Sequence, residues 1–127
     1  MSDVPQILLV DDDRQVVRYL KKALEEGGYS VTATTSSKQA LDSIQEPLPD
    51  LLILDLNMPA PDGFEFLKTV RSRFPYLRIL VISGYLDGAL LEAATLLGAI
   101  ATLAKPVEPK VLVAKVREVL GRHRGES

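Results

Sequence analysis

Short apolar runs and amphipathic stretches alternate along the whole chain. Four runs are almost entirely apolar, at residues 6–10, 51–54, 78–82 and 100–104. Continuous apolar runs of this length are typical of strands buried on both faces of a parallel sheet. A fifth stretch, 29–34, alternates polar and apolar residues, as an edge strand does. The pattern therefore predicts five strands, four of them buried, with 51–54 at the centre of the sheet.

The amphipathic stretches between these runs predict five helices. The first begins near Asp13 and ends at Gly27, because aspartate caps a helix amino terminus and glycine commonly follows the last turn. Ser36 and Gln39 have the spacing of a capping box, which opens the second helix. Similar signals predict the other three helices. One runs from Asp62 to before Pro75, with Phe64, Leu67 and Val70 facing inward. The next runs from Asp87 to Leu97, and the last from near Pro109 to Gly121.

This order of elements predicts an α/β fold of the doubly wound (βα)5 type, a three-layer sandwich with helices on both faces of a parallel sheet. A chain of 127 residues is long enough for one such domain and one core. We assign the domain to residues 1–121 and regard 122–127 as a tail or the start of a linker. Because the sequence has no cysteine, disulfides and thiolate metal sites are excluded.

The charge of the chain is balanced, with 15 basic and 17 acidic residues. Direct nucleic-acid binding requires clustered basic residues and is not expected; Arg71, Arg73 and Arg78 are expected to form only a solvated rim. No apolar run approaches the roughly 18 residues that span a membrane. The amino terminus also has no basic segment followed by an apolar one. We therefore expect a cytoplasmic protein without membrane contact.

Polar residues directly follow the four apolar runs. Asp11 and Asp12 come after the first, Asp55 after the second, Ser83 after the third and Lys105 after the fourth. The carboxyl ends of parallel strands share one edge of the sheet, where ligands of this fold class bind. Carboxylate oxygens suit Mg²⁺, and the Asp55 carboxylate can attack phosphorus to give an acyl phosphate. A hydroxyl and an amine can hold the phosphoryl group, so the set predicts magnesium-dependent phosphoryl transfer.

Four motifs at these strand ends are together highly specific. They are Leu9-Val10-Asp11-Asp12, Leu54-Asp55-Leu56-Asn57-Met58-Pro59 with Asp62-Gly63 behind it, Val81-Ile82-Ser83-Gly84, and Lys105-Pro106. By these motifs the sequence resembles the receiver domain of two-component response regulators over essentially its whole length. The resemblance implies a flavodoxin-like fold with strand order 2-1-3-4-5. It also implies a phosphorelay signalling protein that catalyses only its own phosphorylation and dephosphorylation.

The same resemblance implies a role for each acidic residue. Asp55 is the phosphoacceptor, and a histidine kinase or a phosphotransfer protein is the donor. Asp12, Asp55 and the main-chain carbonyl of Asn57 bind Mg²⁺ directly, while Asp11 acts mainly through a metal-bound water. Asn57 and Tyr85 occupy the two variable positions that, in this family, tune dephosphorylation by controlling how water reaches the acyl phosphate.

The resemblance also covers the remaining strand ends, with one departure. Ser83 and Lys105 are implied to contact the phosphoryl group, and the bond from Lys105 to Pro106 is implied to be cis, which costs little before proline. Thr102 stands where most receivers carry an aromatic residue that turns inward when the phosphorylated loop closes. We still expect phosphorylation, because the five site residues are unaltered, but its relay to the surface must take another form.

The predicted helix at 87–97 is apolar around more of its circumference than a surface helix needs. Contiguous exposed apolar area usually marks a partner site. We therefore expect the face formed by this helix, the strand at 100–104 and the last helix to serve for homodimerisation or effector docking.

Three other functions fit the sequence less well. A phosphate-independent, receiver-like binding module is supported only by Thr102. A magnesium-dependent phosphatase-like enzyme would need a second aspartate as general acid where Asn57 stands. A flavodoxin-like cofactor binder would hold its phosphate against the three aspartates at 11–13, which would repel it. The receiver function is therefore favoured.

Overall fold

Five strands and five helices alternate along the described part of the chain. This computed structural model describes residues 4–57, 63–84 and 88–124, with the backbone alone at 88–91 and 122–124. The elements are β1 (Gln6–Val10), α1 (Arg14–Glu26), β2 (Ser30–Thr34), α2 (Ser37–Ser43), β3 (Leu51–Asp55), α3 (Gly63–Arg73), β4 (Ile79–Ser83), α4 (Gly88–Leu96), β5 (Ala101–Ala104) and α5 (Pro109–Arg124). None of the described helices is long and apolar enough to cross a membrane.

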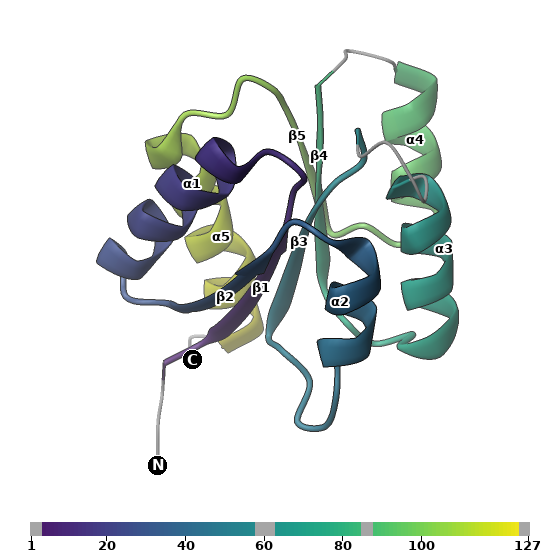
Figure 1. The fold of residues 1–127 in the computed structure, drawn as a ribbon, viewed down its shortest axis with the longest axis horizontal. Helices are drawn as coiled ribbons and strands as arrows, with labels where there is room; N and C mark the ends of the chain where they lie inside the picture. The colour runs from purple at the N-terminus through teal and green to yellow at the C-terminus, as the bar shows by residue number, and fades with distance from the viewer. Residues whose placement is uncertain (1–3, 58–62, 85–87, 125–127) are drawn as a thin grey trace.

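The five strands form one parallel sheet in the order β2-β1-β3-β4-β5. Helices α1 and α5 cover one face, and α2, α3 and α4 cover the other (Figure 1). The predicted doubly wound three-layer sandwich is confirmed, as is the strand order implied by the resemblance. From β1 the chain passes to β2 on one side and then returns to β3 on the other. The carboxyl ends of β1 and β3 therefore lie at the point where the strand order reverses, which is where this fold binds ligands.

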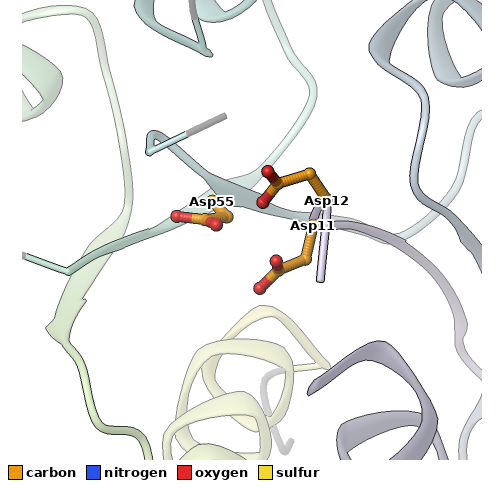
Figure 2. A group of neighbouring side chains, drawn as sticks. All are labelled: Asp11, Asp12 and Asp55. Carbon is orange, nitrogen blue, oxygen red and sulfur yellow. The ribbon is translucent and has the colours of Figure 1, made fainter. Parts of the chain in front are cut away.

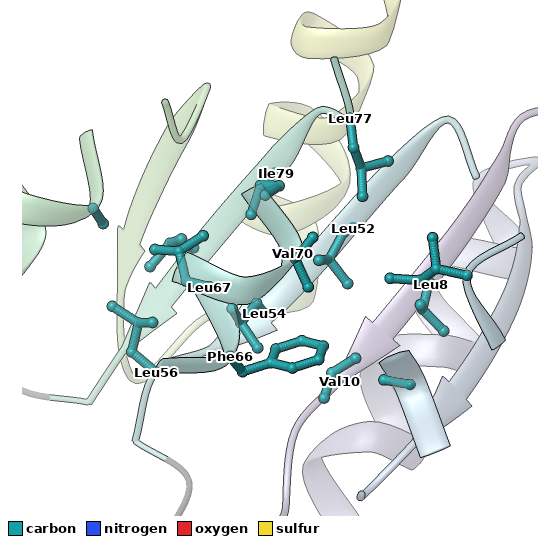
Figure 3. Close-up of a cluster of buried hydrophobic side chains, with 14 residues drawn as sticks. Leu8, Val10, Leu52, Leu54, Leu56, Phe66, Leu67, Val70, Leu77 and Ile79 are labelled. Carbon is teal, nitrogen blue, oxygen red and sulfur yellow. The ribbon is translucent and has the colours of Figure 1, made fainter. Parts of the chain in front are cut away.

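The central strand, β3, contributes to two separate hydrophobic cores. Leu52 and Leu54 pack with the α2, α3 and α4 layer, whereas Leu51 and Ile53 pack with α1 and α5. Figure 3 shows the first of these cores, which includes Phe66 of α3. Every residue of β3 is buried, and the strand pairs with a neighbour on each side. Asp55, the last residue of β3, is thus carried by one of the most firmly held segments of the chain.

The two edge strands, β2 and β5, are less buried than the strands between them. The prediction that β5 is a buried strand was wrong, because all of Ala101–Ala104 is only half-buried. Strand β5 pairs with β4 on one side, and no strand of the described part of the chain lies on the other. Its apolar side chains are therefore only partly covered, because the strand lies at the edge of the sheet and not in its interior.

Side chains cap two of the described helices at their amino termini. Asp13 Oδ1 accepts hydrogen bonds from two backbone N–H groups of the first turn of α1, at 2.9 and 3.2 Å, which confirms the predicted cap. Ser36 Oγ accepts from the Gln39 N–H at 3.2 Å. The second hydrogen bond of the predicted capping box, from the Ser36 N–H to the Gln39 side chain, was wrong. The Ser36 N–H donates instead to Thr34 Oγ1 at 3.1 Å, and Thr34 Oγ1 donates to Gln39 Oε1 at 3.1 Å. Thr34 takes the place that Gln39 was expected to fill.

The inward stripe of α3 differs from the prediction by one aromatic residue. Leu67 and Val70 are fully buried, as expected. Phe66 is 4% exposed, whereas Phe64 is only half-buried. Since α3 begins at Gly63, the positions at helical spacing that face the sheet are 66, 67 and 70, with Phe64 at the margin of the stripe.

The last helix is longer than expected. It continues through Gly121 to Arg124, past the residue where the chain was expected to fray, because one glycine within a helix costs only about 1 kcal/mol. The domain limit at residue 121 stays a prediction. Five positions singled out in the sequence lie outside the described residues: Met58 and Pro59 of the second motif, the predicted cap Asp62, the variable position Tyr85 and the predicted helix start Asp87.

We predict that Phe66→Ala lowers the free energy of unfolding by about 3–5 kcal/mol, since it removes a buried aromatic ring and leaves a cavity. Tyr76→Ala is the matched control, because Tyr76 is 93% exposed and its loss should change stability by no more than about 0.5 kcal/mol. Urea unfolding followed by circular dichroism measures both variants. Equal losses in the two would contradict the packing described for α3.

Candidate functional site

Three carboxylates gather at the carboxyl ends of the neighbouring strands β1 and β3. Asp11 and Asp12 directly follow β1, and Asp55 is the last residue of β3. Val10 pairs with Leu54, which brings the two strand ends level. One oxygen from each carboxylate lies within 4.8 Å of the others (Figure 2). The structure thus brings together the acidic residues that the sequence placed at one edge of the sheet.

Lys105 and Ser83 complete this edge from the side of β4 and β5. Lys105 Nζ donates to Asp55 Oδ2 at 2.8 Å and lies 3.6 Å from Asp11 Oδ2. The Lys105 backbone N–H donates to the Ser83 carbonyl at 2.8 Å, which ties the ends of the two strands together. Ser83 is the last residue of β4 and is 0% exposed. All five polar residues that follow the predicted strands therefore lie at one end of the sheet.

Both carboxylate oxygens of Asp55 have a defined partner. Oδ2 accepts from Lys105 Nζ, and Oδ1 accepts from the Asn57 N–H at 2.9 Å. The residue is 1% exposed. Two donors from different loops hold the orientation of the carboxylate, while each oxygen keeps a lone pair that can accept a cation or attack an electrophile.

Asp11 is equally buried but is incompletely hydrogen-bonded. Its Oδ1 accepts from the Asp13 N–H at 3.0 Å, whereas its Oδ2 has no hydrogen-bond partner among the described residues. The 3.6 Å separation from Lys105 Nζ is an ion-pair distance but too long for a hydrogen bond. Burial raises the pKa of Asp11 to about 6, and the negative charge of Asp55 adds to this rise. The hydrogen bond from the Asp13 N–H and the positive charge of Lys105 both act to lower the pKa, but burial outweighs them.

The two buried carboxylates, Asp55 and Asp11, also shift the pKa of Lys105. Burial alone would lower the pKa of Lys105. The hydrogen bond and the charge of Asp55, together with the charge of Asp11, outweigh burial, so the pKa of Lys105 is raised. The ammonium therefore stays charged and is able to pair with an anion.

The donor set fits a hard divalent cation. Three carboxylates face one nearby ammonium, and the buried Asp11 Oδ2 lacks a hydrogen-bond donor. Mg²⁺ prefers such oxygens, takes one or two carboxylates and keeps several waters. Asp12 is exposed, so the cluster is open to solvent on one side. Asp11, Asp12 and Asp55 are therefore candidate metal ligands.

Asn57 links two loops across the site. Its backbone N–H holds Asp55, and its side-chain Oδ1 accepts a hydrogen bond from the Gly84 N–H on the loop after β4. The loop after β3 is also tightly packed, because a Cβ at Gly63 would lie 2.7 Å from the Leu56 carbonyl oxygen. Glycine at that position lets α3 begin beside the end of β3.

Two further predicted positions lie near this edge. Thr102 is half-buried in β5, where it pairs with Val81. The bond from Lys105 to Pro106 is cis, as the resemblance implied. Pro106 lines a cavity of about 460 Å³ that Asp11, Asn57 and Lys105 also line.

This cavity has an apolar wall that the sequence did not assign to the site. Val16 and Tyr19 of α1 and Val107 after β5 line it, and Tyr19 is 44% exposed. The sequence pattern placed Val16 only on the buried face of the first helix. Since residues three apart lie on the same side of a helix, the spacing of Val16 and Tyr19, one turn after the acidic loop, was the signal that could have identified the wall.

Comparison with known sequences gives consistent matches. The sequence model of the family described as the response regulator receiver domain matches residues 7–117. The chain is 38% identical over 119 residues to the transcriptional activator protein ExaE of Pseudomonas putida and 39% identical over 120 residues to the transcriptional regulatory protein CpxR of Escherichia coli K12. Each match covers 92% of this chain but only 56% and 50% of the relative. The chain thus spans about half the length of these relatives.

Solved structures of receiver domains share the fold. A CheY-like response regulator receiver domain protein from Methanospirillum hungatei JF-1 matches with a TM-score of 0.89 at 28% identity, covering 98% of this chain and 100% of that one. The chemotaxis protein CheY4 of Vibrio cholerae matches with a TM-score of 0.83 at 30% identity, covering 91% and 98%. The likeness therefore extends over nearly the whole chain.

We predict that Asp11→Asn stabilises the metal-free protein at neutral pH. Because burial raises the pKa of Asp11 from its ordinary 3.8 to about 6, the folded state binds this proton more tightly, and the stability of the parent falls as pH rises from about 4 to about 6. The variant should lack this loss and be more stable at pH 7 by up to about 3 kcal/mol, with no difference below pH 4.

Urea unfolding in EDTA across this pH range measures the effect. Asp42→Asn, at an exposed carboxylate of α2, is the control and should follow the parent at every pH. A stability difference between Asp11→Asn and the parent that did not vary with pH would contradict the assignment to Asp11 ionisation.

Proposed function

The chain belongs to the response regulator receiver domain family, and on that basis we propose that Asp55 accepts a phosphoryl group from a histidine kinase or a phosphotransfer protein in a magnesium-dependent reaction. The observation that carries the proposal is a buried carboxylate at the end of β3, 2.8 Å from Lys105 Nζ and beside two further carboxylates. A structural ion pair needs only one carboxylate. Clustered carboxylates at the ligand-binding edge of this fold support a functional site.

In the proposed reaction an oxygen of Asp55 attacks the phosphorus of a phosphohistidine. A P–O bond forms as the P–N bond breaks, and the imidazole leaves with the bonding electron pair and takes up a proton. The product is a mixed anhydride of the Asp55 carboxyl group and phosphate. The Asn57 N–H holds the attacking carboxylate in place, and Lys105 supplies positive charge to the phosphoryl oxygens.

Asp11, Asp12 and Asp55 would hold Mg²⁺, and the Asn57 carbonyl would add a ligand as in the family pattern. When bound, Mg²⁺ neutralises charge on the transferred phosphoryl group. The orphaned Asp11 Oδ2 supports this assignment, because a cation would satisfy it directly or through a coordinated water.

The added phosphate carries a charge of about −2 and shifts a pre-existing equilibrium between two surfaces. Ser83 hydrogen-bonds the phosphoryl group in the favoured state, and Lys105 pairs with it. Thr102 has no ring to turn inward, so the change reaches the surface through the loop between β4 and α4, which Asn57 already contacts at Gly84. A cytoplasmic location and the domain limit at residue 121 belong to the same proposal.

We predict that incubation with acetyl phosphate and magnesium adds one phosphoryl group to the parent, seen by intact-mass spectrometry. Asp55→Asn should give no adduct, because the nucleophile is lost. Lys105→Met should form the adduct about 100-fold more slowly, since it removes a charge aimed at the transferred group. EDTA should abolish the reaction.

The control for these variants is Asp42→Asn, which removes a carboxylate far from the strand ends and should behave as the parent. No adduct on the parent, or an adduct on Asp55→Asn, would exclude the proposed phosphoacceptor.

The partner-binding face in this proposal is formed by α4, β5 and α5. Val111 of α5 is 46% exposed. Val111 and Val113 lie on opposite sides of the buried Leu112 on this helix. The side chain of Val113 approaches Gly27 at the end of α1. Val111 is therefore turned away from α1. The side chains of Leu90 and Leu91, central to the docking face expected from the sequence, lie outside the described residues.

We predict that phosphorylation favours a homodimer through this face and that Val111→Glu prevents it, because a carboxylate would be buried at the interface. Light scattering coupled to size exclusion, with and without acetyl phosphate, measures the mass. Val4→Glu is the matched control, since Val4 is 45% exposed at the opposite end of the sheet, before β1. A phosphorylated parent that stayed monomeric would exclude the dimer.

A further inference from the structure

Arg71 is bonded to the main chain of two separate turns. Its Nε donates to the Leu97 carbonyl at 2.9 Å, and Nη2 donates to the Gly98 carbonyl at 3.2 Å. Nη1 donates to the carbonyls of Phe74 and Pro75, at 3.3 and 2.8 Å. Four of the five guanidinium N–H groups are thereby used on backbone oxygens. Arg71 is therefore not one of three solvated arginines, as the sequence suggested.

These acceptors lie where two helices end. Phe74 and Pro75 follow α3, and Leu97 and Gly98 follow α4. Carbonyls at helix carboxyl termini lack partners within the helix and carry partial negative charge, so a single guanidinium satisfies and neutralises both ends. Arg71 is half-buried in this position, and this burial lowers its pKa.

The helix segments on both sides of this contact pack in the same hydrophobic core. Arg71 follows Val70, which is fully buried with its α3 neighbours Phe66 and Leu67, so the arginine projects from a fixed base. Toward the carboxyl end of α4, Ala94 is fully buried and Leu97 packs on the same core.

The turn after α4 is also built closely around the arginine. Gly98 adopts a φ of +90°, and a Cβ there would lie 3.2 Å from Arg71 Nε. A side chain at position 98 would be strained and would crowd the guanidinium, so this glycine lets the contact form.

We propose that Arg71 pins the carboxyl end of α4 to α3 and makes that end the fixed point of a pivot. The opposite end of α4 is joined through the β4–α4 loop to Ser83 and Gly84, at the edge of the sheet that carries the site. Any displacement that begins at Ser83 therefore enters α4 at Gly88 and diminishes toward Leu97. The last step rests on the proposed phosphorylation of Asp55, whereas the pin is a property of the unphosphorylated protein.

Amide hydrogen exchange measured by NMR tests the pin without phosphorylation. The informative amides are those of Leu97, Gly98 and Ala99, which donate to carbonyls of the last turn of α4. In Arg71→Met they should exchange at least tenfold faster than in the parent, while core amides of α1 change much less. Arg73→Met, at an exposed arginine in the same last turn of α3, is the matched control and should stay within twofold of the parent.

A gain in exchange spread evenly over all helices of Arg71→Met would mean a global loss of stability and would overturn the pin. Unchanged exchange at Leu97, Gly98 and Ala99 would overturn it as well.

The pivot is tested by amide chemical shifts before and after acetyl phosphate with magnesium, with intact mass recorded on the same samples. In the parent, shifts should be large at residues 88–92 and small at 96–100, whereas in Arg71→Met they should extend along the helix. Equal shifts at both ends of the parent helix would overturn the pivot. If mass shows no adduct, the proposed function fails, and the pin is decided by the exchange rates alone.

Discussion

The candidate site depends on electrostatic repulsion between the carboxylates of Asp11 and Asp55, which the paired strands keep close together. Asp11 and Asp55 are each 1% exposed, and the pairing of β1 with β3 keeps their carboxylates side by side. Lys105 offsets part of this repulsion through its bond to Asp55, yet one oxygen of Asp11 stays without a hydrogen-bond partner among the described residues. The site is thus left with room for positive charge, which a cation or a rearranged lysine can fill.

The fold could be predicted because its signals are local. Strands β1, β3 and β4 are apolar on both faces, each crossover contains a helix, and caps such as Asp13 mark the helix starts. The site was predictable for a topological reason, since residues directly after parallel strands must share one edge of the sheet. Asp55 and Lys105, 50 positions apart, meet for that reason alone.

The features that escaped prediction depend on neighbours distant in sequence. The partial exposure of β5 follows from its place at the sheet edge, which a run of apolar residues does not reveal. Tyr19 belongs to the cavity wall because α1 passes beside the loop after β5. In the sequence, Arg71 looks like any other arginine of its helix. Its role depends on carbonyls 26 and 27 positions away, which only the fold brings beside it. Composition and periodicity carry no information about such contacts.

For the proposed phosphorylation of Asp55, the burial of β3 has a consequence for how the donor must behave. Asp55 sits at the end of a strand that is enclosed on both faces and bonded on both edges, so it cannot move out to meet a donor. The donor has to bring its phosphorus to a stationary oxygen. A protein that docks beside the site raises the effective concentration of its phosphohistidine there, whereas a small acyl phosphate can reach the same rate only by abundance. Selectivity among donors is then a matter of docking, and the chemical step can remain the same for all of them.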